Sequence, residues 1–196
     1  MPHLHTSPHQ HDMTVSAYIV RNDDDAWRCL VHLHKKLDKL MQIGGHIELD
    51  ETPWQAVAHE VDEEAGYSLD ELKVLQPFAD TPHGWGNTVH PVPFSANTHN
   101  VGDDHYHSDS CYAFIADALP SRSTADNESD DLRWLTIDEL NTLAKKGDAL
   151  QDVAYIYEYL LRHMDHMIPL SASDFSLEKP RNMGVVYKRG KPSENR

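Results

Sequence analysis

The chain has 196 residues, of which 39% are hydrophobic and 25% are charged, a balance that suits one globular domain with a substantial core. Lysine and arginine number 17 against 32 aspartate and glutamate residues, which gives a formal net charge of −15. An acidic surface repels a phosphate polymer, so long nucleic acids are not expected as partners. A small anionic substrate is compatible with this charge only if metal cations neutralise part of an acidic site.

The sequence carries no signal for a membrane or for secretion. No run of about 18 apolar residues occurs, and residues 1–12 lack the basic start and apolar stretch of a signal peptide. We therefore expect a soluble, cytoplasmic protein without membrane contact. Cys29 and Cys111 each lie in an apolar segment, which favours buried thiols over a disulfide or a thiolate metal site.

The first predicted elements are two strands and a glycine loop. Residues 14–20 and 27–33 are rich in β-forming side chains and flank a polar turn, so we expect an antiparallel hairpin. Residues 40–43 form a short apolar piece that ends at Gly44 and Gly45, where the backbone can approach a ligand closely. A change from strand to loop is expected there.

A helix is predicted to follow this loop. Thr52 as N-cap, Pro53 at the first helical position and Gln55 at the third form a capping box, and Gly66 supplies the stop. Apolar side chains fall on one narrow face of the helix, which we expect to be buried: Trp54, Val57, Ala58, Val61 and Ala65.

Strands and two further helices are expected in the second half of the chain. The strand candidates are residues 72–79, 88–94, 111–118 and 132–135, and residues 95–109 are predicted to be a long functional loop. Thr136 and Glu139 form a second capping box that opens a helix to about residue 146. A third helix carries an apolar stripe: Val153, Ile156, Tyr157, Leu160, Leu161 and Met164.

The composition divides the chain into three segments. Residues 1–12 hold four histidines without periodicity and are predicted to be a flexible N-terminus. Residues 13–170 are predicted to form the folded domain. Residues 171–196 combine glycine and proline breaks with basic side chains, and we expect a partly ordered C-terminal arm.

The predicted helix at residues 52–65 carries three glutamates that could bind a cation. Glu60, Glu63 and Glu64 are three and four positions apart, so their carboxylates cluster away from the apolar stripe. Like charges at this spacing destabilise a helix by roughly 0.2–0.5 kcal/mol per pair unless something compensates. Hard cations such as Mg²⁺ or Mn²⁺ would compensate, because they favour carboxylate oxygens. The alternative is a solvated acidic face.

The residues around these glutamates resemble the Nudix box of MutT-like hydrolases. The matching positions are Gly45, Glu51, Glu60, Glu63, Glu64 and Gly66. His59 is the one departure, because the family has arginine there. The resemblance implies an α/β fold, namely the Nudix-type α/β/α sandwich with a mixed β-sheet between helices.

The resemblance also implies an activity and a set of site residues. It implies a hydrolase in which Glu60, Glu63 and Glu64 are catalytic metal ligands for Mg²⁺ or Mn²⁺, and in which Gly44 contributes its carbonyl. Glu48 would lie near the substrate or a second metal. The substrate would be a small nucleoside diphosphate-linked molecule, and residues 51–57 resemble the branch that converts a (d)NTP to the monophosphate and pyrophosphate. Homodimers are frequent in the family.

A second group of polar residues ends the predicted loop at residues 95–109. His105, His107 and Asp109 alternate, so an extended chain places them on one side, and we expect them to face the site. The alternative is a polar strand end with solvated histidines. Family members often take a further acid from a distant loop as metal ligand or base, and the candidates here are Asp103, Asp104, Asp109 and Glu128.

His59 is expected to replace the family arginine by pairing with Glu51. A protonated imidazole makes an ion pair, and a neutral one donates a single N–H, so both alternatives stay open. Two other function classes are the alternatives. An isopentenyl-diphosphate isomerase-like enzyme needs a cysteine at the site, and neither Cys29 nor Cys111 lies in a suitable loop. A non-catalytic nucleotide-binding Nudix sensor would normally lose a carboxylate, and all three are present.

Overall fold

The computed structural model describes residues 7, 9–80, 87–102 and 104–179. The strands are β1 His11–Asp23, β2 Ala26–His34, β3 Lys39–Met41, β4 Ile43–His46, β5 Leu72–Gln76, β6 Ser95–Gly102, β7 His105–Ala116, β8 Leu132–Leu135 and β9 Ile168–Ser171. The α-helices are α1 Pro53–Ala65, α2 Ile137–Lys146 and α3 Gln151–His163, and short 3-10 helices lie at Leu69–Glu71, Met164–His166 and Ala172–Asp174. Within these residues, no helix is long and apolar enough to cross a bilayer.

The described strands form one mixed sheet. Its main path runs β3-β2-β1-β7-β5-β9, while β4 pairs with β1, β6 with β7 and β8 with β2. β1 and β7 are parallel, and the other pairs are antiparallel. The predicted hairpin is confirmed as β1 and β2, which pair from Val20 with Cys29 to Asp23 with Ala26.

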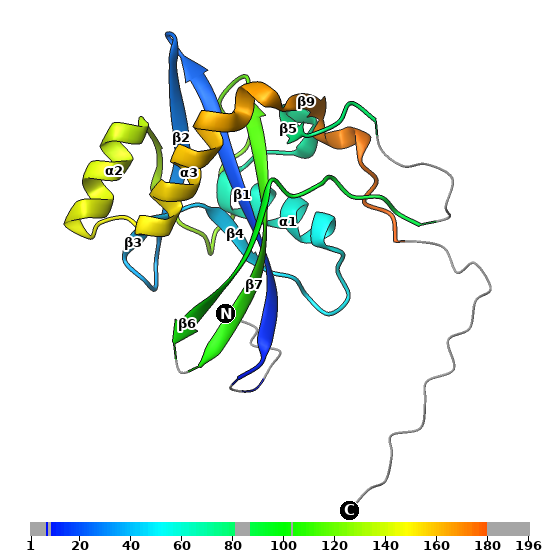
Figure 1. The fold of residues 1–196 in the computed structure, drawn as a ribbon, viewed down its shortest axis with the longest axis horizontal. Helices are drawn as coiled ribbons and strands as arrows, with labels where there is room; N and C mark the ends of the chain where they lie inside the picture. The colour runs from blue at the N-terminus through cyan, green and yellow to red at the C-terminus, as the bar shows by residue number, and fades with distance from the viewer. Residues whose placement is uncertain (1–6, 8, 81–86, 103, 180–196) are drawn as a thin grey trace, which may run out of the picture.

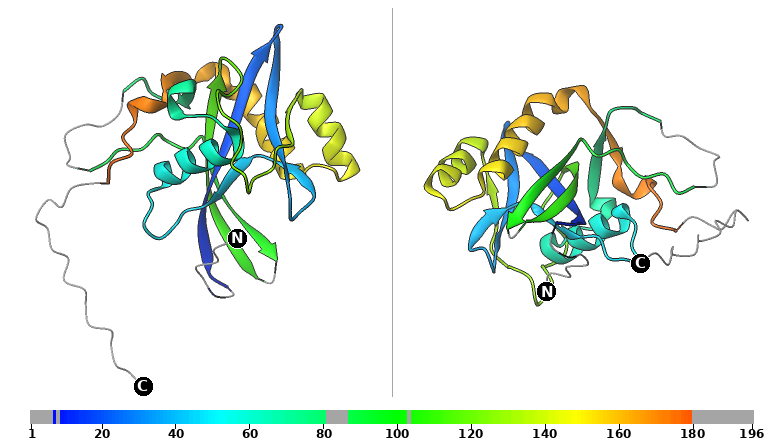
Figure 2. Two further views of the ribbon diagram at one scale, coloured as in Figure 1. Left: turned by 180° about the vertical axis from the view of Figure 1, so that it is seen from behind. Right: turned by 60° about the horizontal axis from the view of Figure 1, so that its bottom comes forward.

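Helices cover both faces of the sheet, as Figures 1 and 2 show. α1 packs on one face, where Trp54, Val57 and Val61 join Val15 and Ala17 of β1 in a buried cluster. α2 and α3 lie on the other face. There a second cluster gathers around α3 and the alternate side chains of β1: Tyr18, Val20, Val153, Tyr157 and Leu160. The expected α/β/α sandwich is confirmed.

The sheet forks along one edge of β1, and this fork places the site. The C-terminal half of β1 pairs with β2, whereas its N-terminal half, at Thr14 to Ala17, pairs with β4. β2 and β4 therefore diverge at the middle of β1. Both strands face α1 at that point, because His32 of β2 and Gly44 of β4 each lie next to Glu64.

The ends of α1 match the sequence prediction. The Thr52 side chain accepts a hydrogen bond from the Gln55 backbone, and the Gln55 side chain accepts one from the Thr52 backbone, so the capping box is formed. Gly66 ends the helix with φ +70°, a conformation that side chains with a Cβ rarely adopt. The buried face holds Ala56 in place of the expected Ala58.

Two predicted segments are wrong. Residues 95–109 are not a loop, because β6 and the start of β7 form an antiparallel hairpin that pairs Ser95 with Cys111 and His99 with His107. Residues 88–94 were expected to be a strand and form none. The hairpin is held by backbone pairing, while many of its side chains are exposed, so apolar periodicity did not mark it.

The folded part is longer than residues 13–170 at both ends. β1 begins at His11 and buries Asp12, both inside the segment expected to be flexible. Phe175 is buried against the ring of Trp54, and the Trp54 indole donates a hydrogen bond to the Phe175 carbonyl. Residues 1–6 and 180–196, which hold the rest of the predicted N-terminus and arm, lie outside the described residues.

Candidate active site

Glu64 is buried against the glycine loop. Its side chain accepts a hydrogen bond at Oε2 from the backbone N–H of Gly44, at 2.9 Å, and the residue is 7% exposed. Burial raises the pKa of Glu64 well above its usual value, and the nearby charge of Glu60 adds to this effect. The Gly44 hydrogen bond acts in the opposite direction but does not outweigh burial.

Glu60 lies one helical turn before Glu64 and faces Gly45. A Cβ built on Gly45 would collide with the Glu60 carboxylate, so the absent side chain leaves room for this carboxylate. Burial raises the pKa of Glu60 to about 7, although the neighbouring His59 lowers it. Two carboxylates that both resist ionisation therefore lie side by side at the fork of the sheet.

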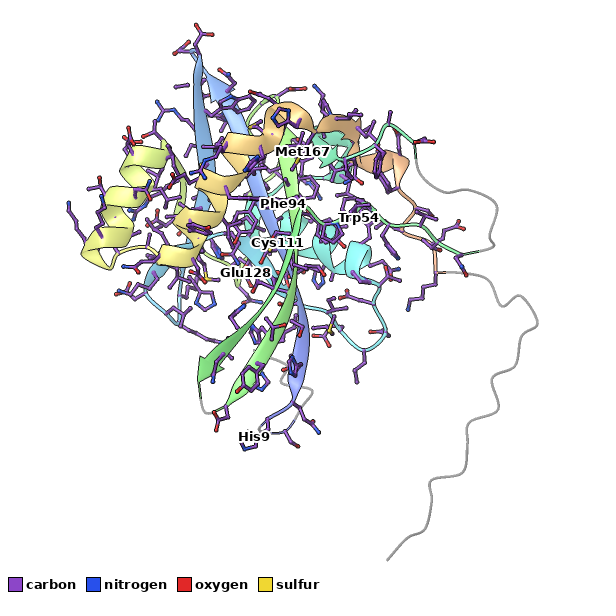
Figure 3. The ribbon with its side chains drawn as sticks, in the orientation of Figure 1. His9, Trp54, Phe94, Cys111, Glu128 and Met167 are labelled. Atoms are coloured by element: carbon purple, nitrogen blue, oxygen red, sulfur yellow. The ribbon has the colours of Figure 1, made fainter. Side chains whose placement is uncertain are left out.

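A third carboxylate comes from the chain between β7 and β8. The charge of Glu128 raises the pKa of both Glu60 and Glu64, which places it near them. Figure 3 labels Glu128 near the middle of the molecule. The other acids named as candidates lie elsewhere: Asp104 is 3.8 Å from His9, Asp109 bonds to hydroxyl groups, and Asp103 is outside the described residues.

His59 connects two other glutamates at the helix surface. Its Nδ1 lies 3.3 Å from Oε1 of Glu51, and its Nε2 lies 3.0 Å from Oε1 of Glu63. Partial burial disfavours the imidazolium, but the hydrogen bond to Glu63 and the surrounding carboxylates outweigh it and raise the pKa of His59. The expected contact with Glu51 is present, and Glu63 shares the same ring.

Glu63 lies at the surface of α1, and Glu48 lies in the turn before this helix. The Glu63 side chain is half exposed, at 49%, and its negative charge contributes to the raised pKa of both Glu60 and Glu64. The backbone N–H of Glu48 donates to Oε2 of Glu51 at 3.3 Å, which closes the turn before α1.

One site residue was not foreseen. His32 of β2 is 1% exposed, and its Nε2 lies 3.8 Å from Oε2 of Glu64. A single histidine in an apolar strand has no spacing that relates it to the glutamates of α1. Only the pairing of β1 with both β2 and β4 brings it behind Glu64.

The donor set suits a hard divalent cation. Glu60 and Glu64 offer carboxylate oxygens whose ionisation is costly until a positive charge offsets it. In the part of the chain that the structure describes, no three histidine, cysteine, aspartate or glutamate side chains already form a complete metal-binding group.

Comparison with family models identifies the family of the chain. The model described as the NUDIX domain matches residues 10–158. The chain belongs to the Nudix family. It is accordingly a Nudix hydrolase, an enzyme that acts on phosphorus-containing acid anhydrides. No curated protein matches the chain.

Solved structures with the Nudix fold resemble the chain over most of its length. A NUDIX family hydrolase from Clostridium perfringens is 24% identical, covers 78% of this chain and 97% of its own, and superposes with a TM-score of 0.61. The NUDIX domain of Shewanella oneidensis NrtR, solved with ADP ribose, is 14% identical, with coverage of 79% and 89% and a TM-score of 0.59. A Caenorhabditis elegans Ap4A hydrolase is 14% identical, with coverage of 77% and 98% and a TM-score of 0.57.

The three residues of the second polar group lie on the sheet face opposite to α1 of this Nudix domain. Asp109 accepts hydrogen bonds from Thr14 at 3.0 Å and Ser16 at 2.8 Å. His105 and His107 are on the same side of β7, in contrast to the expectation that they face Glu60 and Glu64. They do cluster, because their ring centroids are 5.5 Å apart.

A buried carboxylate organises these histidines. Asp12 is 2% exposed, and its Oδ2 lies 3.1 Å from Nε2 of His105 and 3.7 Å from Nε2 of His46. The His107 ring packs edge-on against His46 with centroids 4.8 Å apart. Burial lowers the pKa of His107 to about 4, and the neighbouring His46 adds to this, so that ring is neutral.

Gly45→Ala is expected to reduce hydrolysis strongly while the protein stays folded. The new methyl group would displace the Glu60 carboxylate, which is the free end of a flexible side chain and can move at little cost. We therefore expect near wild-type thermal unfolding together with a large loss of kcat. Gly66→Ala is the matched control, because its Cβ would meet the Arg122 backbone and its φ is +70°, so it should destabilise the fold. Wild-type kcat in Gly45→Ala would contradict the placement of Glu60.

His59→Arg is expected to remove a pH dependence of stability. Because the folded-state pKa of His59 is raised, its stabilising contribution is complete below the unfolded pKa of about 6.5 and is lost as pH rises through the folded value. Arginine stays charged across this range. Denaturant unfolding of both proteins from about pH 5.5 to 8.5 brackets that reference value. Parallel curves would favour the neutral imidazole over the protonated pair.

Proposed function

We propose that this Nudix hydrolase cleaves a pyrophosphate bond in a small nucleoside diphosphate-linked substrate, with Mg²⁺ or Mn²⁺ as cofactor. The observation that carries the proposal is a pair of neighbouring carboxylates, the buried Glu64 and the half-buried Glu60, held against Gly44 and Gly45. Burying two acids together is unfavourable for a protein that never binds a cation. A substrate with phosphate groups and a divalent cation would offset that cost.

The residues that would hold the metal are Glu60, Glu64, Glu63 and the carbonyl of Gly44. The hydrogen bond from the Gly44 N–H to Oε2 would hold the Glu64 carboxylate against the glycine loop while the metal is bound. When bound, the metal supplies an activated water and a positive charge that stabilises the transferred and leaving phosphate oxygens.

Among the four acids considered outside α1, we assign the general base to Glu128, because its charge acts on both Glu60 and Glu64. Glu128 lies in the chain between β7 and β8, and its negative charge raises the pKa of both Glu60 and Glu64. In the reaction that we propose, the Glu128 carboxylate accepts one proton from the attacking water. The new bond joins the water oxygen to phosphorus, and the bond that breaks joins the same phosphorus to the bridging oxygen, which leaves with the second phosphate group.

The substrate class follows from charge and from the relatives. The formal net charge of −15 disfavours long nucleic acids and is compatible with a small phosphate ester that arrives with its metal. The similar proteins act on Ap4A or were solved with ADP ribose, both of which are nucleotides joined through phosphate anhydrides. A (d)NTP, cleaved to the monophosphate and pyrophosphate, is the form that residues 51–57 favour. We further propose a cytoplasmic location, no membrane contact and a homodimer.

The isomerase alternative is disfavoured by the two cysteines. Cys29 is fully buried, and burial raises the pKa of its thiol to about 12. Cys111, labelled in Figure 3, is also buried and faces Asp109 and Asn97 instead of α1. Neither thiol is placed to exchange protons with a substrate at Glu60. A sensor without catalysis is disfavoured because Glu60, Glu63 and Glu64 are all retained.

A panel of nucleotides tests the proposal. The purified protein is incubated with dNTPs, dinucleoside polyphosphates and nucleotide sugars, each with Mg²⁺ and with Mn²⁺, and the products are resolved by ³¹P NMR. We expect at least one compound to be split at a single phosphate-phosphate linkage. If no phosphate anhydride on the panel is hydrolysed with either metal, the proposed function is wrong.

A further inference from the structure

His32 is a buried polar side chain that the reaction described above does not use. It lies on β2 below α1 and is 1% exposed. Within the described residues, neither of its ring nitrogens has a hydrogen-bond partner. Buried polar atoms in proteins are nearly always paired, so an imidazole with both nitrogens unpaired requires an explanation. Its Nε2 lies 3.8 Å from Oε2 of Glu64.

We propose that His32 is a positioning residue, whose Nε2–H orients the Glu64 carboxylate for metal binding. This inference rests on the proposed function, because it assumes that Glu64 binds a metal. His32 does not touch the substrate or the metal. It acts through Glu64, in the way that neighbouring hydrogen-bond partners commonly fix the orientation of metal-ligating side chains.

The fork of the sheet explains how this orientation works. Gly44 on β4 and His32 on β2 both approach the same oxygen, Oε2 of Glu64, from two strands that diverge along β1. A carboxylate oxygen has two lone pairs and can accept from both donors. Two donors on Oε2 would hold the Glu64 carboxylate in one orientation. His32 Nε2 would have to move about 0.9 Å closer to Oε2 of Glu64 to reach the usual length of a hydrogen bond. Such a contact can tighten when the site is filled.

The role requires only a neutral His32 ring. A neutral imidazole carries one N–H, which can donate to a carboxylate oxygen. A neutral donor adds no positive charge next to a metal site. It can therefore hold Glu64 without competing with the cation for the carboxylate.

Three variants separate this role from simple packing. His32→Leu removes the donor and keeps an apolar side chain, whereas His32→Gln places an amide N–H near the position of Nε2. His90→Leu is the control, because His90 is another histidine with an unpaired Nδ1 and is only partly buried. Mn²⁺ binding is measured by titration calorimetry, and unfolding is measured with the metal removed.

Metal affinity and stability should respond differently. We expect His32→Leu to weaken Mn²⁺ binding by about 10- to 100-fold, the usual effect of losing a partner of a metal ligand. Its metal-free stability should stay at or above that of the wild type, because the buried ring makes no hydrogen bond that would be lost. His32→Gln should retain most of the affinity, and His90→Leu should bind like the wild type.

A spectroscopic reading on the wild type completes the test. With ¹⁵N-labelled histidine, we expect the His32 ring to show the neutral tautomer protonated at Nε2, and its signals to shift when Mg²⁺ is added. Wild-type Mn²⁺ affinity in His32→Leu would overturn the inference, and so would a tautomer protonated at Nδ1. If His32→Leu binds Mn²⁺ as tightly as the wild type, only the role of His32 is wrong and the proposed function stands. A wild type that binds no Mn²⁺ would overturn both the role of His32 and the proposed function.

Discussion

Glu64→Gln is expected to lower kcat by at least about 100-fold, which corresponds to about 2.7 kcal/mol of transition-state stabilisation. The amide keeps the shape of the side chain but removes the anionic oxygen that we assign to the metal. Stability should not fall with activity. In the metal-free protein, burial already raises the pKa of Glu64 well above its usual value, so a neutral side chain fits the site. The measurement combines steady-state kinetics at saturating Mg²⁺ with thermal unfolding in chelator.

Glu158→Gln is the matched control for Glu64→Gln. Glu158 lies on α3, where its exposed carboxylate pairs with Arg162, and it has no contact with the site. Its loss should leave kcat unchanged, because exposed pairs of this kind contribute little even to stability. If both Glu64→Gln and Glu158→Gln keep the wild-type kcat in the same assay, Glu64 is not a catalytic metal ligand.

The metal-free protein is expected to lose stability as pH rises from about 4.5 to about 7. Glu60 has a folded-state pKa of about 7, raised by burial above its ordinary value of 4.5. An acid whose pKa is raised in the folded state makes its full contribution to the free energy of unfolding below the unfolded pKa. That contribution is lost as pH rises through the folded pKa. For Glu60, the loss is on the order of 3 kcal/mol. Glu64 contributes in the same direction.

Denaturant unfolding of the wild type and Glu60→Gln in chelator measures this effect. The difference between the two curves removes all titrations that they share, including those of the many histidines. We expect the wild type to lose stability relative to Glu60→Gln across this window, and added Mg²⁺ to restore it. Equal slopes for the two proteins would show that Glu60 ionises freely and is not buried as described.

Local chemistry made the Nudix helix predictable. The capping box at Thr52 and Gln55 and the stop at Gly66 depend on neighbouring residues alone, and both form as expected. Glu60 and Glu64 could be placed on one side of α1, because helix geometry relates residues four positions apart. Their depth of burial could not be predicted, because it depends on strands β2 and β4, which come from elsewhere in the chain.

Long-range pairing accounts for what the sequence did not reveal. His32 and Glu128 reach the site through the sheet and through a distant connection, and neither has a spacing that relates it to α1. Glu128 was one of four acids named, and only tertiary structure distinguishes it from Asp109. The alternation of His105 and His107 correctly placed them on one side of a strand. The same pattern could not show whether these side chains lie on the face of the sheet that α1 covers or on the opposite face.

The most direct test of the account is the recovery of hydrolysis by metal after complete removal. The protein is treated with EDTA and desalted, and it is then assayed on the best nucleotide of the panel without metal and with increasing Mg²⁺ or Mn²⁺. We predict no turnover above background in the metal-free protein and full recovery in the wild type, with Glu64→Gln remaining inactive at every metal concentration. Undiminished hydrolysis by the metal-free protein would contradict the account.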